Sequence, residues 1–224
     1  IFMILGIILG IVLFRKLLEK KAVPNSIISF YYTTGLLSVG IGLLSAILFQ
    51  SMYHLLQRGE LAFTGMTFLG GLIGGAAAFF GIYFLKAKQE EKEYFAIVLQ
   101  AAVVSLLLGH FLGRVGCFTA GCCHGIETDF FLGMRFPGHD HKIHPTQLYE
   151  AFVLLGLFLI SINLFNKNKP VLPLYLIGYG IGRFLIEFLR GDERGTFIPG
   201  ISPSQFWSII MVFLGVYFVV KAHC

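Results

Sequence analysis

Seven apolar stretches, separated by short polar segments, run along the chain. They cover residues 1–18, 26–50, 65–85, 94–112, 146–165, 172–189 and 205–220. Their lengths are close to the roughly 17–25 residues with which a helix crosses a bilayer. A helix also satisfies its own backbone amides, as the hydrocarbon region requires. The pattern predicts an all-α integral membrane protein with seven transmembrane helices.

The positions of the cations between these stretches predict an orientation. Alternate connections hold ten and six Lys or Arg residues. Because cations are retained on the cytoplasmic side, we expect the N-terminus outside and the C-terminus in the cytoplasm. The longer connections 51–64, 113–145 and 190–204 then face outward. We expect residues 1–224 to form a single polytopic membrane domain, with the extracytoplasmic loop 113–145 forming much of its active face.

Composition agrees with a membrane protein and excludes other classes. Of the 224 residues, 56% are hydrophobic and 13% are charged, whereas soluble domains carry about 25% charged residues. Soluble enzymes, disordered chains and disulfide-rich mini-domains are therefore excluded. The formal net charge is +5, but the cations lie in short connections and do not form the basic face that a nucleic-acid partner needs.

The third apolar stretch contains closely spaced glycines. Residues 70–75 read GGLIGG, which holds two overlapping GxxxG spacings. Small residues at this spacing let two membrane helices approach closely, so we expect tight helix packing here.

Charged residues interrupt the later apolar stretches. A charge near the centre of a membrane helix costs about 2.5–3.5 kcal/mol on insertion scales, so each needs a partner or a function. Arg183 and Glu187 are four residues apart on one helical face, and Arg190 follows three residues later. The first two could form an ion pair that joins two helices, or they could form part of a binding site.

Further polar residues gather at the predicted outer ends of two other segments. His110 and Arg114 are one turn apart in the fourth segment, and His144, Gln147 and Glu150 begin the fifth. Guanidinium groups offer several fixed donors, which suits the phosphate ester of a lipid headgroup. Together these segments predict an outward-facing site for an anionic phospholipid.

Residues 113–125 are rich in small residues and in cysteine. The small residues could let the backbone approach a ligand closely and donate amides to a phosphate oxygen. The cysteines are Cys117, Cys122 and Cys123. They could bind a metal together with His124 or His144, form a disulfide, pack as small apolar groups, or supply a reactive thiolate beside Arg114.

Taken in chain order, these motifs resemble the prolipoprotein diacylglyceryl transferase family. The matching segments are 65–74 (GMTFLGGLIG), 113–125, 144–150 (HPTQLYE) and 178–190 (GYGIGRFLIEFLR), followed by Asp192 and by Ser204-Gln205. The resemblance implies an enzyme that moves the diacylglyceryl group of phosphatidylglycerol to the lipobox cysteine thiol of a prolipoprotein and releases glycerol phosphate. It implies a location in the bacterial cytoplasmic membrane, with the active site toward the extracytoplasmic leaflet.

The resemblance also implies roles for individual residues. Arg114 and Arg183 would hold the lipid phosphate and stabilise the charge of the leaving group, with Glu187 orienting Arg183. His144 is the first candidate for the base that takes the thiol proton, and His110 is the second. The expected substrate-binding residues are Gly113, Gly116, Cys117, Gly125, Gln147, Glu150, Tyr179 and Arg190. The expected partners are phosphatidylglycerol or another anionic phospholipid, the prolipoprotein lipobox segment and the membrane, with no cofactor or resident metal.

Several positions depart from the family pattern. The family carries His where this chain has Leu69, Asn where it has Cys117 and Ala120, and Glu where it has Cys122. Two alternatives therefore stay open beside the main interpretation. One is a divergent paralogue that transfers a phospholipid-derived group to another acceptor with thiol or metal assistance, and the other is a non-catalytic protein that binds anionic lipid.

Overall fold

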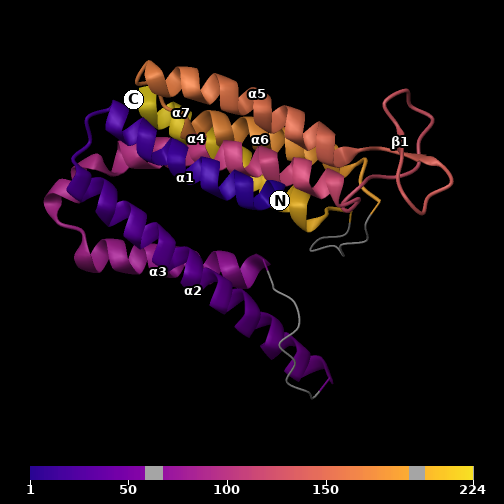
Figure 1. The fold of residues 1–224 in the computed structure, drawn as a ribbon, viewed down its shortest axis with the longest axis horizontal. Helices are drawn as coiled ribbons and strands as arrows, with labels where there is room; N and C mark the ends of the chain where they lie inside the picture. The colour runs from indigo at the N-terminus through magenta and orange to yellow at the C-terminus, as the bar shows by residue number, and fades with distance from the viewer. Residues whose placement is uncertain (59–67, 192–199, 224) are drawn as a thin grey trace. The chain divides into compact units, whose positions relative to one another are not determined.

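A computed structural model describes residues 1–58, 68–191 and 200–223, which are mostly helical (Figure 1). Each predicted apolar stretch corresponds to one helix. The helices are α1 (Phe2–Lys20), α2 (Asn25–Arg58), α3 (Phe68–Lys86), α4 (Gln89–Thr119), α5 (Thr146–Asn166), α6 (Leu172–Glu187) and α7 (Pro203–His223).

Four of the described helices are long and apolar enough to cross a membrane. These candidate spans are Asn25–Met52, Gln89–Thr119, Thr146–Asn166 and Pro203–Lys221, and a shorter apolar helix covers Gly70–Lys86. Many large apolar side chains on the helices are exposed, as expected where lipid is the surrounding solvent. The seven spans and the orientation of the termini remain predictions.

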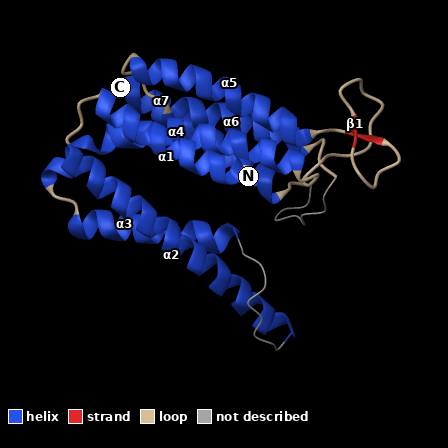
Figure 2. Cartoon of the chain, viewed as in Figure 1, coloured by secondary structure: helices blue, strands red, loops and turns tan. Residues whose placement is uncertain are grey.

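The connection expected at 113–145 is shorter than the sequence suggested. Helix α4 continues through Thr119, so the prediction of a loop from residue 113 is wrong at its start. Within the remaining connection, β1 (Met134–Arg135) pairs antiparallel with β2 (Lys142–Ile143), a small hairpin that the all-α prediction did not contain (Figure 2). Helix α2 likewise extends to Arg58, into the predicted connection 51–64. Residues 59–67 and 192–199, which fall in or beside connections expected to face outward, lie outside the described part.

Residues Leu18–Val98 form one of two compact units, in which α2 packs against α3. The contact depends on residues without a side chain. A Cβ atom built on Gly42 would lie 2.9 Å from the Gly71 carbonyl oxygen, and one on Gly75 would lie 3.2 Å from that of Ser38. The GGLIGG segment therefore brings two backbones together, which confirms the packing expected from its spacing.

The second unit comprises Ile1–Leu17 and Leu99–Cys224 and contains the polar residues singled out above. Helices α1 and α4 meet closely, since a Cβ on Gly6 would lie 2.9 Å from the Gly109 carbonyl oxygen. Helix α6 packs against both α5 and α7. Gly178 and Gly182 face α5, whereas Gly180 faces α7. The alternating small residues of 178–182 thus let α6 lie close to two neighbours at once.

The α2–α3 contact gives a stability prediction. Replacing Gly42 with Val should force the two backbones apart and lower the free energy of unfolding by about 1–3 kcal/mol, the usual cost of overpacking. Gly40→Val is the matched control, because a Cβ at this exposed position on the same helix meets nothing within 4 Å. Thermal unfolding in detergent measures the difference. Equal melting temperatures for the two variants would contradict close α2–α3 packing.

Candidate active site

A buried carboxylate connects three helices of the second unit. Glu150, on α5, is 1% exposed. Its Oε1 atom lies 3.0 Å from Nη2 of Arg114 on α4 and accepts a hydrogen bond of 2.8 Å from the Tyr179 hydroxyl on α6. His110, one turn before Arg114, places Nε2 at 3.6 Å from the same oxygen. An ionised carboxylate is stable in such surroundings only when it is paired and hydrogen-bonded, and these neighbours provide both.

Helix α6 supplies a row of functional groups at every fourth position. The rings of Tyr175 and Tyr179 stack with their centroids 5.6 Å apart. Arg183 follows and is 6% exposed. Its Nη2 atom lies 2.6 Å from Oε2 of Glu187, as the i, i+4 spacing predicted, and donates a 2.9 Å hydrogen bond to the Ser204 hydroxyl. The row places Arg183 one turn from Tyr179 on the same side of the helix.

The start of α7 holds the second ion pair in place. The Ser202 hydroxyl accepts a 3.2 Å hydrogen bond from the Gln205 amide, while the Gln205 side chain accepts one of 3.0 Å from the Ser202 amide. This reciprocal arrangement is a capping box, with Pro203 at the first helical position. The same Ser202 hydroxyl donates to Oε1 of Glu187 at 2.8 Å. The Ser202 cap therefore holds the Glu187 carboxylate in position, and this carboxylate holds the Arg183 guanidinium.

Sequence reasoning missed Ser202 and Ser204 as members of the site. The signal was present, because S-P-S-Q at residues 202–205 matches the capping-box pattern S-x-x-Q before an apolar run. The capping-box pattern does not predict which helix lies next to the cap. Only the fold brings the start of α7 to the end of α6.

Buried polar atoms in this region keep hydrogen-bonding capacity. Among the described residues, Nε of Arg114, Nη1 of Arg183, Oε1 of Gln147 and Oε2 of Glu150 are buried and have no hydrogen-bond partner. An unpaired buried donor costs about 1–3 kcal/mol, so such atoms are uncommon unless a ligand uses them. The two guanidinium donors suit the oxygens of an anionic ligand.

The end of α4 brings two of the cysteines together. Helix α4 ends in a Schellman motif: the Gly121 amide bonds the Phe118 carbonyl at 3.0 Å, and the Cys122 amide bonds the Cys117 carbonyl at 3.2 Å. Gly121 has a φ of 67°, in the left-handed region that this motif requires. In a Schellman motif the residue after the left-handed position folds back over the last full turn, which here places Cys122 against Cys117.

The chain beyond α4 is docked on the first turn of α5. The Gln147 side-chain amide donates to the Cys122 carbonyl at 2.6 Å, and the Thr146 hydroxyl donates to the Cys123 carbonyl at 3.0 Å. Cys123 itself has a φ of 64°, which is strained for a residue other than glycine. The two hydrogen bonds hold this conformation and thereby fix the direction of the third cysteine.

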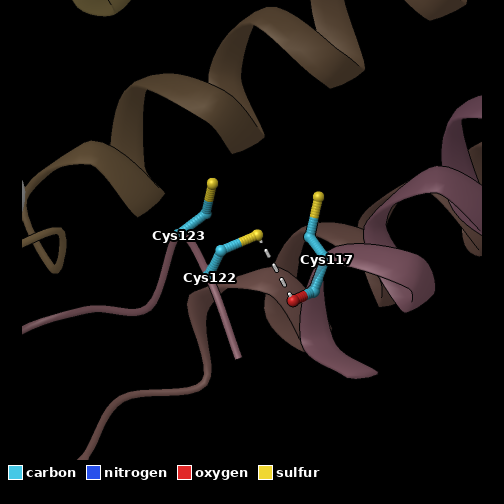
Figure 3. A group of neighbouring side chains, drawn as sticks. All are labelled: Cys117, Cys122 and Cys123. Atoms are coloured by element: carbon cyan, nitrogen blue, oxygen red, sulfur yellow. Dashed lines mark hydrogen bonds between the residues drawn. The ribbon is translucent and has the colours of Figure 1, made fainter. Parts of the chain in front are cut away.

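The three thiols form one group (Figure 3). Their sulfur atoms all lie within 4.8 Å of one another, and all three cysteines are free. The disulfide considered from the sequence is therefore not formed. Partial burial and the neighbouring thiols of Cys123 and Cys117 raise the pKa of Cys122 to about 11, which argues against Cys122 as the reactive thiolate. The group could hold a metal ion.

The glycines of residues 113–125 do not form the expected phosphate-binding loop. Residues 113–119 are helical, and the amides of residues 120–122 bond back to the end of α4, so the prediction of free backbone donors there is wrong. Gly116 lies against α1, since a Cβ there would be 3.3 Å from the Phe2 Cβ. Gly113 has open space beside it. Gly125 forms a short bridge with Arg190, and its amide donates to the His144 carbonyl at 2.8 Å; a side chain at Gly125 would meet the Leu189 carbonyl oxygen.

The predicted histidines lie in different surroundings. His144 places Nδ1 at 3.1 Å from the Tyr149 hydroxyl and packs near the Phe130 ring. His110, the second candidate base, is the histidine that lies beside Glu150 and packs edge-on against Tyr179 at 5.1 Å. Leu69 belongs to α3, but its side chain lies outside the described part of the chain, as does Asp192. The structure thus brings together Arg114, Glu150 and Tyr179 with His110.

Removing the hydroxyl of Ser202 should weaken both the cap and the ion pair behind it. We expect Ser202→Ala to lower the free energy of unfolding by about 1–2 kcal/mol, since it removes an N-cap and a hydrogen bond to a buried carboxylate. Ser202→Thr keeps a hydroxyl that can cap the helix and should retain most of the stability. Chemical or thermal unfolding of both variants in detergent tests this. Equal losses of unfolding free energy in Ser202→Ala and Ser202→Thr would show that the shape of the side chain, and not its hydroxyl, stabilises this position.

Comparisons with known proteins identify the family of this chain. A family model described as prolipoprotein diacylglyceryl transferase matches residues 1–221. A phosphatidylglycerol–prolipoprotein diacylglyceryl transferase of Clostridium tetani is 31% identical over 225 residues, covering 95% of this chain and 88% of the relative. Proteins of the same name from Methylobacillus flagellatus and Haemophilus influenzae are 36% and 33% identical, over 90% and 96% of this chain and 78% and 85% of their own lengths. The chain belongs to the prolipoprotein diacylglyceryl transferase family.

Proposed function

We propose that this protein transfers the diacylglyceryl group of phosphatidylglycerol to the lipobox cysteine thiol of a prolipoprotein and releases glycerol phosphate. The observation that carries the proposal is the pair of arginines Arg114, which is partly buried, and Arg183, which is buried. Each is held by a carboxylate, and each keeps a buried N–H donor without a partner among the described residues. Two fixed cations with spare donors suit a phosphate diester that becomes a more highly charged monoester on reaction.

The arrangement favours stabilisation of the leaving group. Glu150 and Glu187 balance the two guanidinium charges, so the site without ligand is close to neutral and stable in an apolar bundle. A bound phosphate adds negative charge next to donors that are already oriented. As the bond from carbon to the phosphate oxygen breaks, charge grows on that oxygen, and preorganised donors stabilise the transition state more than the bound lipid.

Thiolate attack requires that the acceptor thiol lose its proton. Of the two candidate bases, His110 lies in the Glu150 cluster and near the phosphate-binding arginines, whereas the ring of His144 contacts Tyr149 and Phe130. We therefore place the base at His110. Tyr179 and Glu150 position Arg114, and Gln147, one turn before Glu150 on α5, has a side-chain carbonyl oxygen without a partner among the described residues.

The proposed topology puts this chemistry at the outer leaflet of the cytoplasmic membrane. Helices α1 and α6, with 19 and 16 residues, add two apolar helices to the four candidate spans and the shorter helix α3. Seven spans forming a single membrane domain, with the N-terminus outside, place the end of α4 and the starts of α5 and α7 on the extracytoplasmic side. The cation distribution between segments supports this orientation.

Arg114 should be irreplaceable by lysine, which carries the same charge but lacks the planar set of donors. We expect Arg114→Lys to lower diacylglyceryl transfer by about 10²–10³-fold, the usual effect of removing a transition-state donor. Arg135→Lys, in the exposed hairpin, is the matched control and should transfer normally. The assay measures by mass spectrometry the diacylglyceryl mass added to a lipobox peptide in the presence of phosphatidylglycerol. Full activity of Arg114→Lys would overturn the assigned role.

The two histidines can be separated by a paired experiment. His110→Gln should reduce turnover by about 10²–10⁴-fold, as expected for a missing general base, and should leave phosphatidylglycerol binding intact. His144→Gln should reduce turnover less than His110→Gln does. His141→Gln, in the exposed hairpin turn, is the control and should keep normal turnover. A larger loss for His144→Gln than for His110→Gln would return the base to His144.

A further inference from the structure

The cysteine group has the chemistry and the geometry of a metal site. Thiolate sulfur is the preferred ligand of zinc and related thiophilic ions. In a tetrahedral zinc site with Zn–S bonds of about 2.3 Å, neighbouring sulfurs are about 3.8 Å apart. The sulfurs of Cys117, Cys122 and Cys123 already lie within 4.8 Å of one another. These separations exceed the spacing around zinc by about 1 Å at most.

The fold builds this group. The Schellman motif of α4 brings Cys122 back to Cys117, and the Cys122 thiol donates to the Cys117 carbonyl at 3.6 Å (Figure 3). Gln147, which is 1% exposed, holds the Cys122 carbonyl, and Thr146, which is fully buried, holds that of Cys123. The Gln147 carbonyl oxygen remains without a partner among the described residues. Two independent helix-end contacts therefore fix the backbone that carries Cys122 and Cys123.

The group offers three ligands. His124 is the next residue in the chain, but its ring contacts Phe136 and His139 at centroid distances of 5.4 Å and 4.8 Å. It does not belong to the metal-ligating group found among the described residues. Zinc with three protein ligands keeps a fourth position for water or substrate, which is the arrangement of catalytic sites and not of structural ones. Cys122 is exposed, so this position is accessible.

The site lies next to the phosphate-binding residues. Cys117 follows Arg114 by three residues on α4, on the same face of the helix. Gln147, which holds the Cys122 carbonyl, precedes Glu150 by three residues on α5. A thiol bound at the open position would therefore approach the lipid from the side where Arg114 holds its phosphate.

We propose that Cys117, Cys122 and Cys123 bind a zinc-class ion whose open position takes the acceptor thiol as a thiolate. The proposal rests on the transferase function above. The metal would bind the acceptor sulfur, and the thiol proton would pass to water, which can carry it on to His110. The sulfur electron pair then forms a bond to the glyceryl carbon. The bond from that carbon to the phosphate oxygen breaks, and its electrons leave with glycerol phosphate.

The first test measures the site without using turnover. Purified full-length protein, reduced and then loaded with Zn²⁺, should hold about one ion per chain by elemental mass spectrometry. Loading with Co²⁺ should give thiolate-to-metal charge-transfer bands. Both signals should disappear in the variant Cys117→Ser/Cys122→Ser/Cys123→Ser and persist in Cys224→Ser, which leaves the group untouched. Retention of both signals by the triple variant, or their absence from the wild type, would overturn the site.

The second test asks whether the open position takes the acceptor. Adding a lipobox peptide with its cysteine should change the Co²⁺ spectrum, and the same peptide with serine should not. Identical responses to the two peptides would overturn the proposed ligand, even if a metal is bound. The triple variant must keep the wild-type melting temperature and bind phosphatidylglycerol, and Cys122→Ser alone serves as the milder variant should the triple variant not fold.

The transfer assay separates this proposal from the proposed function. Removing the metal by chelation should reduce transfer by about 10²–10⁴-fold, comparable to losing a general base, and Zn²⁺ should restore it. Full transfer by metal-free protein would overturn the metal proposal and leave the transferase function standing. A metal site that responds to the cysteine peptide, in a protein that transfers nothing from phosphatidylglycerol, would support the site and overturn the transferase function.

Discussion

Two arginines among apolar helices, Arg183 buried and Arg114 partly buried, are the constraint on which the site depends. A guanidinium cannot give up its proton, so burial requires a carboxylate partner and further hydrogen bonds. Arg114 finds Glu150 and Arg183 finds Glu187. Each carboxylate in turn needs a hydroxyl, which Tyr179 and Ser202 supply. The demand of two cations for partners thus determines which residues face each other on α4, α5, α6 and α7.

The helices were predictable because their cause is local. A long apolar run must be helical in a membrane, and each of the seven runs is a helix. The end of α4 was not predictable in the same way. The glycines of this segment suggest a loop by composition. Gly113 and Gly116 instead continue the helix, and Gly116 allows close contact with α1. The third glycine is Gly121. Only Gly121 ends the helix, and the reason is the left-handed position of the Schellman motif.

In the site, too, contacts between residues near in sequence were predictable, whereas contacts between distant residues were not. The Arg183–Glu187 pair follows from a spacing of four within one helix, so the sequence was sufficient. The Arg114–Glu150 pair joins residues from two helices whose relative register the sequence does not fix. For the same reason the choice between His110 and His144 could not be made from the chain alone, since His110 lies just before one matching motif and His144 begins another. Ser202 carried a readable capping signal, but not the information that its hydroxyl reaches Glu187.

Helix α4 arranges the proposed reaction along one face. His110, Arg114 and Cys117 are spaced by four and three residues, so they follow each other on successive turns of the same side. The base, the phosphate-binding cation and the first thiol therefore occur in this order toward the end of the helix. In the proposed reaction, a phosphate at Arg114 would place the lipid between the turns that carry His110 and Cys117. This spacing favours direct displacement at carbon, because a nucleophile delivered from the cysteine side and a leaving oxygen held by the arginines act on the same short segment of the lipid.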